Sequence, residues 1–259
     1  MTRLAANLTM LFTEQPFLER FKAAADAGFK AVEFLFPYAF DPEQIADQLR
    51  ANQLQLVLHN LPAGNWDGGE RGIACHPDRV AEFRAGVDDA IRYARALEVP
   101  QLNCLVGILP QGVSREAARE VLVGNLKYAA GKLKENGIRL LIEPINSFDI
   151  PGFFLNTTRQ AVELILATGS DNLFVQYDIY HMQRMEGELA NTIKANLSLI
   201  RHVQLADNPG RFEPGTGEIN YRYLFRFLDE IGYDGWIGCE YKPRAGTKEG
   251  LGWIKDHGL

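Results

Sequence analysis

One glutamate stands at the end of an apolar segment near the middle of the chain, where a carboxylate is costly to bury. Residues 138–142 read Ile-Arg-Leu-Leu-Ile, a pattern typical of a strand that is covered on both faces. Glu143 follows at the last position of this strand, and Pro144 ends the strand because it cannot donate a hydrogen bond to a sheet. A buried carboxylate has to be paired or bound to a metal. Glu143 is therefore a candidate functional residue.

Three more polar side chains lie at or near the ends of predicted strands in the second half of the chain. They are Asp178 in the strand 173–179, Gln204 in the strand 201–206 and Glu240 in the strand 236–241. Each of the four could be satisfied separately, by a helix N-terminus or an arginine, but their recurrence on consecutive strands favours one shared ion. Without a cation, three neighbouring carboxylates would raise one another's pKa values. A ligand set of oxygen atoms suits Mg²⁺ or Mn²⁺, because zinc usually recruits histidine or cysteine.

Strands and helices are expected to alternate along the whole chain, eight of each. The predicted strands are 4–10, 29–36, 54–61, 101–106, 138–143, 173–179, 201–206 and 236–241. The predicted helices are 16–27, 42–52, 78–97, 114–137, 159–168, 186–199, 221–231 and 248–255. This alternation implies parallel strands, and eight units in about 250 residues is the size of a (β/α)₈ TIM barrel. In that fold the carboxyl ends of the strands surround one mouth, where the four polar side chains would meet.

The rival architecture is a doubly wound open sheet. That fold would normally carry a glycine fingerprint after its first strand, and residues 7–12 contain no glycine. No linker or low-complexity segment divides the chain. We therefore expect residues 1–259 to form a single α/β domain with the TIM barrel fold.

Composition excludes several classes of protein. The 259 residues carry a net charge of −6, which offers nucleic acid no broad cationic surface. No apolar segment approaches the roughly 20 residues that span a bilayer, and Asn7 and Thr9 interrupt the apolar N-terminal segment, which argues against a signal peptide. Three cysteines, at 75, 104 and 239, share no metal-binding spacing and are expected to stay reduced. We expect a cytoplasmic protein with a small-molecule substrate and neither nucleic-acid nor membrane partners. Its oligomeric state is left open, a homo-oligomer included.

Five segments of the chain carry distinctive motifs: Glu143-Pro-Ile-Asn146, Tyr177-Asp-Ile-Tyr-His181, residues 204–220, Gly238-Cys-Glu-Tyr241 and the loop that holds Trp66, Glu70 and Arg71. Together they resemble the hydroxypyruvate isomerase family, which includes the related 2-oxotetronate isomerases and belongs to the xylose isomerase-like TIM barrels. The resemblance implies that Glu143, Asp178, Gln204 and Glu240 bind a divalent metal. It also implies that Glu143 and Glu240 are the catalytic acid and base.

The implied reaction is an aldose–ketose type isomerisation of a small 2-oxo acid through a cis-enediol. The expected substrate is hydroxypyruvate, converted to 2-hydroxy-3-oxopropanoate (tartronate semialdehyde), with a 2-oxotetronate as the alternative that is one carbon longer. A metal that chelates the reacting oxygens stabilises the enediolate, and two carboxylates can remove and return the proton.

A 2-oxo acid also needs a partner for its carboxylate. Arg211 is the expected residue, because a guanidinium binds a planar carboxylate bidentately, and His181 would assist it. The resemblance places both at the substrate, whereas Arg71 and Lys242 are weaker candidates.

Three other functions are weighed against the isomerase. A ketose 3-epimerase is disfavoured because related epimerases usually have histidine at the position of Gln204 and glutamate at that of Asp149. A DNA-repair endonuclease of the same superfamily would need a zinc site rich in histidine, and the chain has five histidines. A non-catalytic sugar-binding barrel would not need the pair of glutamates.

Overall fold

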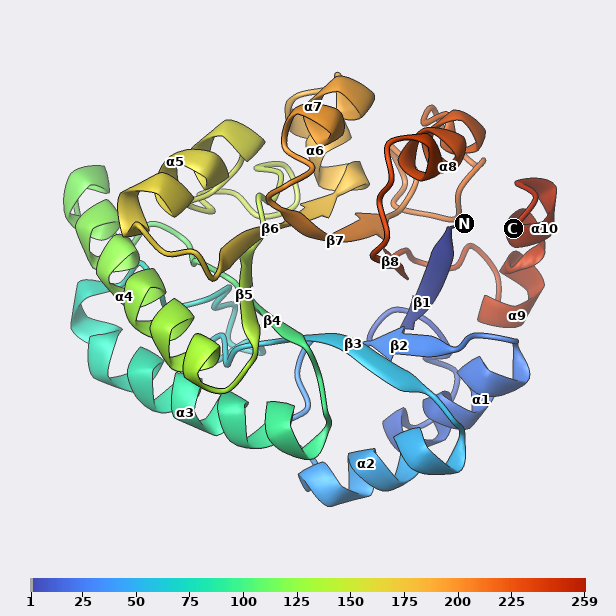
Figure 1. Ribbon diagram of the computed structural model, residues 1–259, viewed down its shortest axis with the longest axis horizontal. Helices are drawn as coiled ribbons and strands as arrows, with labels where there is room; N and C mark the ends of the chain where they lie inside the picture. Colours follow the sequence, from blue (N-terminus) through green and yellow to red (C-terminus); the bar gives the residue numbers. More distant parts are fainter. Residues whose placement is uncertain (1) are drawn as a thin grey trace.

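Eight parallel strands close into a barrel in the order in which they follow one another in the chain (Figure 1). The computed structural model describes residues 2–259, so Met1, which the expected domain includes, lies outside the described residues. The strands are β1 Arg3–Asn7, β2 Ala31–Glu33, β3 Gln55–Asn60, β4 Gln101–Cys104, β5 Arg139–Ile142, β6 Leu173–Asp178, β7 Ile200–Leu205 and β8 Trp236–Cys239. The register pairs Ala5 of β1 with Gly238 of β8, which closes the ring. The predicted TIM barrel is confirmed.

Helices surround the barrel and cover its outer face (Figure 1). The α-helices are α1 Arg20–Asp26, α2 Pro42–Ala51, α3 Val80–Ala96, α4 Arg115–Glu135, α5 Thr158–Thr168, α6 Ile179–Met185, α7 Leu189–Ala195, α8 Tyr221–Glu230, α9 Thr247–Gly250 and α10 Gly252–Asp256, and short 3₁₀ turns, η1 Phe17–Glu19 and η2 Pro77–Arg79, precede α1 and α3. No helix within residues 2–259 is long and apolar enough to cross a membrane.

The segment after β6 differs from the sequence prediction, which placed one helix over 186–199 and no helix between the strand and residue 186. Helix α6 begins directly after β6, and only the shorter α7 lies within the predicted range. The reason is a cap that hydropathy does not reveal. The Asp178 carboxylate accepts hydrogen bonds from the backbone N–H groups of Tyr180 at 2.8 Å and His181 at 3.3 Å, so the strand passes straight into a helix.

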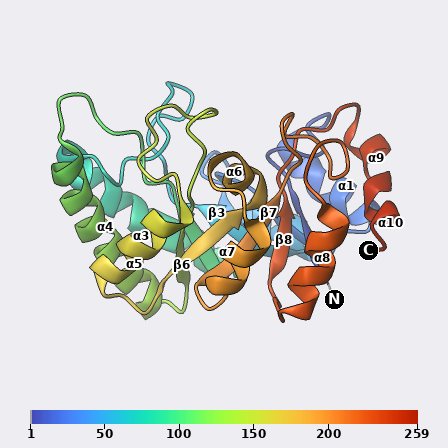
Figure 2. The same ribbon diagram turned by 90° about the horizontal axis from the view of Figure 1, so that it is seen from above.

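Long strand-to-helix loops gather at one end of the barrel, above the carboxyl ends of the strands (Figure 2). The longest are residues 61–76, 143–157 and 206–220. In a TIM barrel this end carries the active site, because side chains from several strands and loops meet there. The opposite end has short connections (Figure 2).

A buried carboxylate, Glu33 at the end of β2, organises the barrel interior beneath those loops. It accepts hydrogen bonds from Asn7 Nδ2 at 2.9 Å, His202 Nε2 at 2.6 Å and Gln204 Nε2 at 2.7 Å. Gly238 on β8 leaves room for it, since a Cβ at that position would lie 2.3 Å from both Glu33 oxygens. The carboxylate thus joins β1, β2 and β7 through side chains that are all at most 2% exposed.

Replacement of Glu33 by alanine is expected to lower the free energy of unfolding by roughly 3–5 kcal/mol, because three buried donors lose their common partner. Urea denaturation followed by circular dichroism measures the change. The matched control is Glu120→Ala on the exposed face of α4, which should stay within about 0.5 kcal/mol of the parent protein. A Glu33→Ala protein as stable as this control would show that the network contributes nothing to the fold.

Candidate active site

The four predicted ligands lie at the carboxyl ends of β5 to β8. Glu143 directly follows β5, Asp178 ends β6, Gln204 lies beside Asp178 in the register of β7, and Glu240 directly follows β8. Their exposed fractions are between 0% and 7%. Glu143, Gln204 and Glu240 line one cavity of about 500 Å³ at this end of the barrel. The four strand ends thus lie at the same end of the barrel, and three of the four side chains line its cavity.

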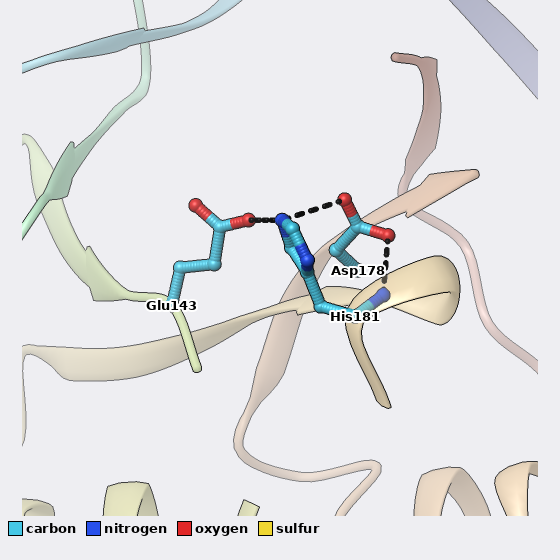
Figure 3. A group of neighbouring side chains, drawn as sticks. All are labelled: Glu143, Asp178 and His181. Atoms are coloured by element: carbon cyan, nitrogen blue, oxygen red, sulfur yellow. Dashed lines mark hydrogen bonds and ion pairs between the residues drawn. The ribbon is translucent and has the colours of Figure 1, made fainter. Parts of the chain in front are cut away.

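Glu143, Asp178 and His181 form a buried group that could hold a metal ion. One ligand atom from each lies within 4.8 Å of the others. Figure 3 shows the His181 ring between the two carboxylates, with Nε2 3.8 Å from Glu143 Oε1 and 3.7 Å from Asp178 Oδ2. Asp178 Oδ2 is buried and has no hydrogen-bond partner among residues 2–259. A buried acceptor without a donor, next to a second carboxylate, fits a site that could hold a metal ion.

The protonation of His181 follows from its neighbour Asn146. The Asn146 side-chain oxygen accepts hydrogen bonds from the backbone N–H groups of Phe148 and Asp149, so its amide nitrogen faces the ring and donates to His181 Nδ1 at 2.6 Å. Nδ1 is then the acceptor of a neutral ring, and Nε2 carries the proton. Burial lowers the pKa of His181 well below its ordinary value, and Arg211 and Arg184 lower it further. The imidazole therefore presents an N–H group to the cavity instead of a free lone pair.

Burial also raises the pKa values of Glu143, Asp178 and Glu240. For Glu143 the charges of Glu240 and Asp178 add to the effect of burial. The pKa of Glu240 rises to about 8 and that of Asp178 to about 6, and in both cases Arg211 offsets part of the burial effect. Three ionised carboxylates therefore need more positive charge at neutral pH than Arg211 supplies. A divalent cation among them would meet that need.

Arg211 lies within the carboxylate cluster. Its Nη2 is 3.4 Å from Glu240 Oε1 and 3.9 Å from Asp178 Oδ2, and its Nη1 is 3.7 Å from Asp149 Oδ2. The loop 206–220 is held in place by the Asp207 carboxylate, which accepts hydrogen bonds from several backbone N–H groups of that loop. Arg211 thus reaches the cavity, as expected, with its charge already shared among three carboxylates.

Gln204 is oriented by its neighbours. Its Nε2 donates to Glu33 Oε1 at 2.7 Å, and its Oε1 accepts from Gln176 Nε2 at 2.6 Å. The amide oxygen therefore faces away from Glu33, and it keeps a second lone pair. Glu33 and Gln176 escaped the sequence analysis, although Glu33 stands in the apolar predicted strand 29–36 with the same signal that singled out Glu143.

Comparison with known proteins places these residues in a family. Residues 21–257 match the family model of the xylose isomerase-like TIM barrels. The chain is 58% identical to hydroxypyruvate isomerase of Escherichia coli K12 over 254 residues, which cover 98% of each protein. It is 45% identical to 2-oxo-tetronate isomerase of Cupriavidus necator, with 99% of each covered.

Two solved structures share the fold. A crystal structure described as AP endonuclease, family 2, from Brucella melitensis superposes with a TM-score of 0.96 at 47% identity, over 99% of both chains. A 3-keto-D-glucoside 4-epimerase from E. coli shares the fold at 20% identity with a TM-score of 0.83, over 99% of both chains. From the family model, the 58% identical relative and the five motifs named above, the chain belongs to the hydroxypyruvate isomerase family of the xylose isomerase-like TIM barrels.

Proposed function

We propose that the protein is a divalent-metal-dependent isomerase that interconverts hydroxypyruvate and 2-hydroxy-3-oxopropanoate. The observation that carries the proposal is the buried set of Glu143, Asp178 and Glu240 at the carboxyl ends of three strands, in a chain that is 58% identical to an enzyme named for this reaction. A 2-oxotetronate is the second candidate substrate. The cavity of about 500 Å³ has room for the extra carbon, and the 2-oxo-tetronate isomerases are also close relatives.

In this proposal Glu143, Asp178, Gln204 and Glu240 hold Mg²⁺ or Mn²⁺ through oxygen atoms. The unpartnered Asp178 oxygen and the raised carboxyl pKa values support this set, as does the Gln204 side-chain oxygen, which faces away from Glu33. His181 is not part of it, because its Nε2 carries a proton. When bound, the ion supplies Lewis-acid stabilisation of the negative charge that develops on the reacting oxygens.

The two glutamates then move the proton. One removes a proton from C3 of hydroxypyruvate, which leaves a cis-enediolate. The proton of the C3 hydroxyl group passes to the C2 oxygen, and the other glutamate returns a proton to C2, which gives the aldehyde at C3 and the hydroxyl group at C2. Burial raises the pKa values of both Glu143 and Glu240, which makes each carboxyl group a better proton acceptor than an exposed glutamate. His181 Nε2–H and the Arg211 guanidinium, which face the same cavity, donate to substrate oxygens.

The direct test is an assay of the purified protein with Mg²⁺ or Mn²⁺ against hydroxypyruvate, 2-oxotetronates and neutral ketoses, with abasic-site DNA as a further substrate. Turnover of a 2-oxo acid supports the proposal, and the ratio of kcat/KM values decides between the two acids. Cleavage of the DNA alone would favour the endonuclease. The site argues against that outcome, because His181 is the only histidine lining the cavity within residues 2–259.

Metal removal is expected to abolish turnover. Dialysis against a chelator should reduce kcat to background, and Mn²⁺ or Mg²⁺ should restore it, since the enediolate charge otherwise meets three carboxylates. Protein dialysed without chelator is the control. Full activity in protein shown by elemental analysis to be free of metal would contradict the proposed cofactor.

Glu240→Gln and Glu143→Gln are each expected to lower kcat by roughly 10²–10⁴-fold, because an amide cannot exchange the proton. Each variant keeps an oxygen ligand, so calorimetry should still detect Mn²⁺ binding. The exposed Glu230→Gln on α8 is the control, with unchanged kinetics. Near-normal turnover in either site variant would remove that glutamate from the acid–base pair.

Arg211→Ala is expected to lower kcat/KM by roughly 10- to 100-fold. Arg211→Lys should lower it by less, because lysine keeps the positive charge and loses only the bidentate donor geometry of the guanidinium. Arg211 lowers the pKa values of Asp178 and Glu240, so its removal raises them. The acidic limb of the pH–rate profile should move to higher pH in Arg211→Ala and stay near its place in Arg211→Lys. If the acidic limb of the pH–rate profile stays in place in both variants, Arg211 does not lower the pKa values of these carboxyl groups.

A further inference from the structure

The cavity is lined by three basic side chains that differ in how their charge is offset. Arg211 shares its charge with Asp149, Asp178 and Glu240. Arg71 and Lys242 also line the cavity, and within residues 2–259 neither forms an ion pair. A substrate that brings its own carboxylate into an acidic site needs a cation that is not already matched. Arg71 and Lys242 are the side chains that can supply it.

The guanidinium of Arg71 is held in one orientation. It lies over the Trp66 ring, with Cζ 4.2 Å from the ring centroid. Its Nη1 donates to the backbone oxygens of Trp66 at 3.0 Å and Glu70 at 2.7 Å. Nε and Nη2 have no hydrogen-bond partner in the described part of the chain. These two atoms form one edge of the guanidinium, which is an edge that binds a carboxylate with two parallel hydrogen bonds.

The loop that carries Arg71 is anchored on both sides of it. Glu70, the neighbouring acid, turns away to Arg79, whose Nη1 lies 2.7 Å from its Oε1, so it does not neutralise Arg71. The Trp66 ring packs against Phe36 at 5.0 Å. Gly72 follows with a φ of 109°, and a Cβ there would lie 2.0 Å from the backbone oxygen of Leu105. The loop therefore presents a preorganised cation to the cavity, which limits the entropy lost on binding.

We infer that Arg71, held on Trp66, binds the carboxylate of the substrate through Nε and Nη2 and so makes the site selective for 2-oxo acids over neutral ketoses. The inference rests on the proposed function. It assigns to Arg71 the role that the sequence alone favoured for Arg211, because Arg211 already serves three carboxylates. Lys242 is exposed and adds positive charge at the rim without a fixed geometry.

The test compares Arg71→Gln, Arg71→Lys and the parent enzyme loaded with Mg²⁺. Titration calorimetry measures the binding of D-glycerate, which has a carboxylate, and of dihydroxyacetone, in which a hydroxymethyl group replaces the carboxylate of hydroxypyruvate. KM and kcat are measured for hydroxypyruvate. The matched control is Arg92→Gln, which removes the same charge from an exposed arginine that lies over Tyr93 and pairs with Asp89.

In Arg71→Gln, the dissociation constant of D-glycerate and the KM of hydroxypyruvate should each rise roughly 10- to 100-fold. Binding of dihydroxyacetone should not change, and kcat should fall less than KM rises, because the anchor is made equally in the ground and transition states. Arg71→Lys should show a smaller loss of the same selectivity. Arg92→Gln should match the parent enzyme.

Two results would overturn the inference. One is a D-glycerate dissociation constant in Arg71→Gln equal to that in Arg92→Gln. The other is an equal loss for D-glycerate and dihydroxyacetone, which would mean that Arg71 only supports the loop. If circular dichroism shows that Arg71→Gln does not fold, Arg71→Lys decides on the same criteria. A parent enzyme that binds D-glycerate through Arg71 but turns over no 2-oxo acid would contradict the proposed function alone.

Discussion

Burial of negative charge is the constraint on which the architecture of this site depends. Glu143, Asp178 and Glu240 come from three strand ends and are almost fully removed from water. An ionised carboxylate in such a place is stable only near opposite charge or several donors. The protein supplies Arg211 and the backbone N–H groups that cap α6, and these still leave Asp178 Oδ2 without a donor. The shortfall of positive charge is what makes a divalent cation the natural complement of the site.

A second buried carboxylate lies below the first group and has the opposite character. Glu33 is fully satisfied by donors from Asn7, His202 and Gln204. Its role is to orient Gln204. Because it accepts a hydrogen bond from the Gln204 amide nitrogen, the Gln204 amide oxygen faces away from Glu33. Gly238 makes this possible, since any side chain on β8 at that height would occupy the space of the carboxylate. The orientation of a proposed ligand on β7 thus depends on residues of β2 and β8 that never reach the cavity.

The sequence was most informative where one residue signals its own environment. The alternation of strand and helix segments predicted eight strands and the barrel. Carboxylates at the ends of apolar strands pointed to Glu143, Asp178 and Glu240, because the cost of burying a carboxylate can be recognised from the neighbouring residues in the sequence. The same signal at Glu33 was overlooked. The tautomer of His181 had no local signal, since it depends on Asn146, which lies 35 residues away and is itself fixed by a turn. The start of α6 was missed because Asp178 was considered only as a ligand, whereas its second oxygen caps the helix.

The distribution of charges between strands and loops explains how one barrel can serve different substrates. Glu143, Asp178, Gln204 and Glu240 are fixed by the rigid barrel, and any substrate with adjacent carbonyl and hydroxyl groups would present the same atoms to them. Arg71 and Trp66 stand on the loop 61–76, in which Gly72 lies against the backbone of Leu105 and Trp66 packs on Phe36. Loops on a rigid scaffold can change without disturbing the strand ends. In the function we propose, the barrel therefore sets the reaction and the 61–76 loop sets the charge of the substrate.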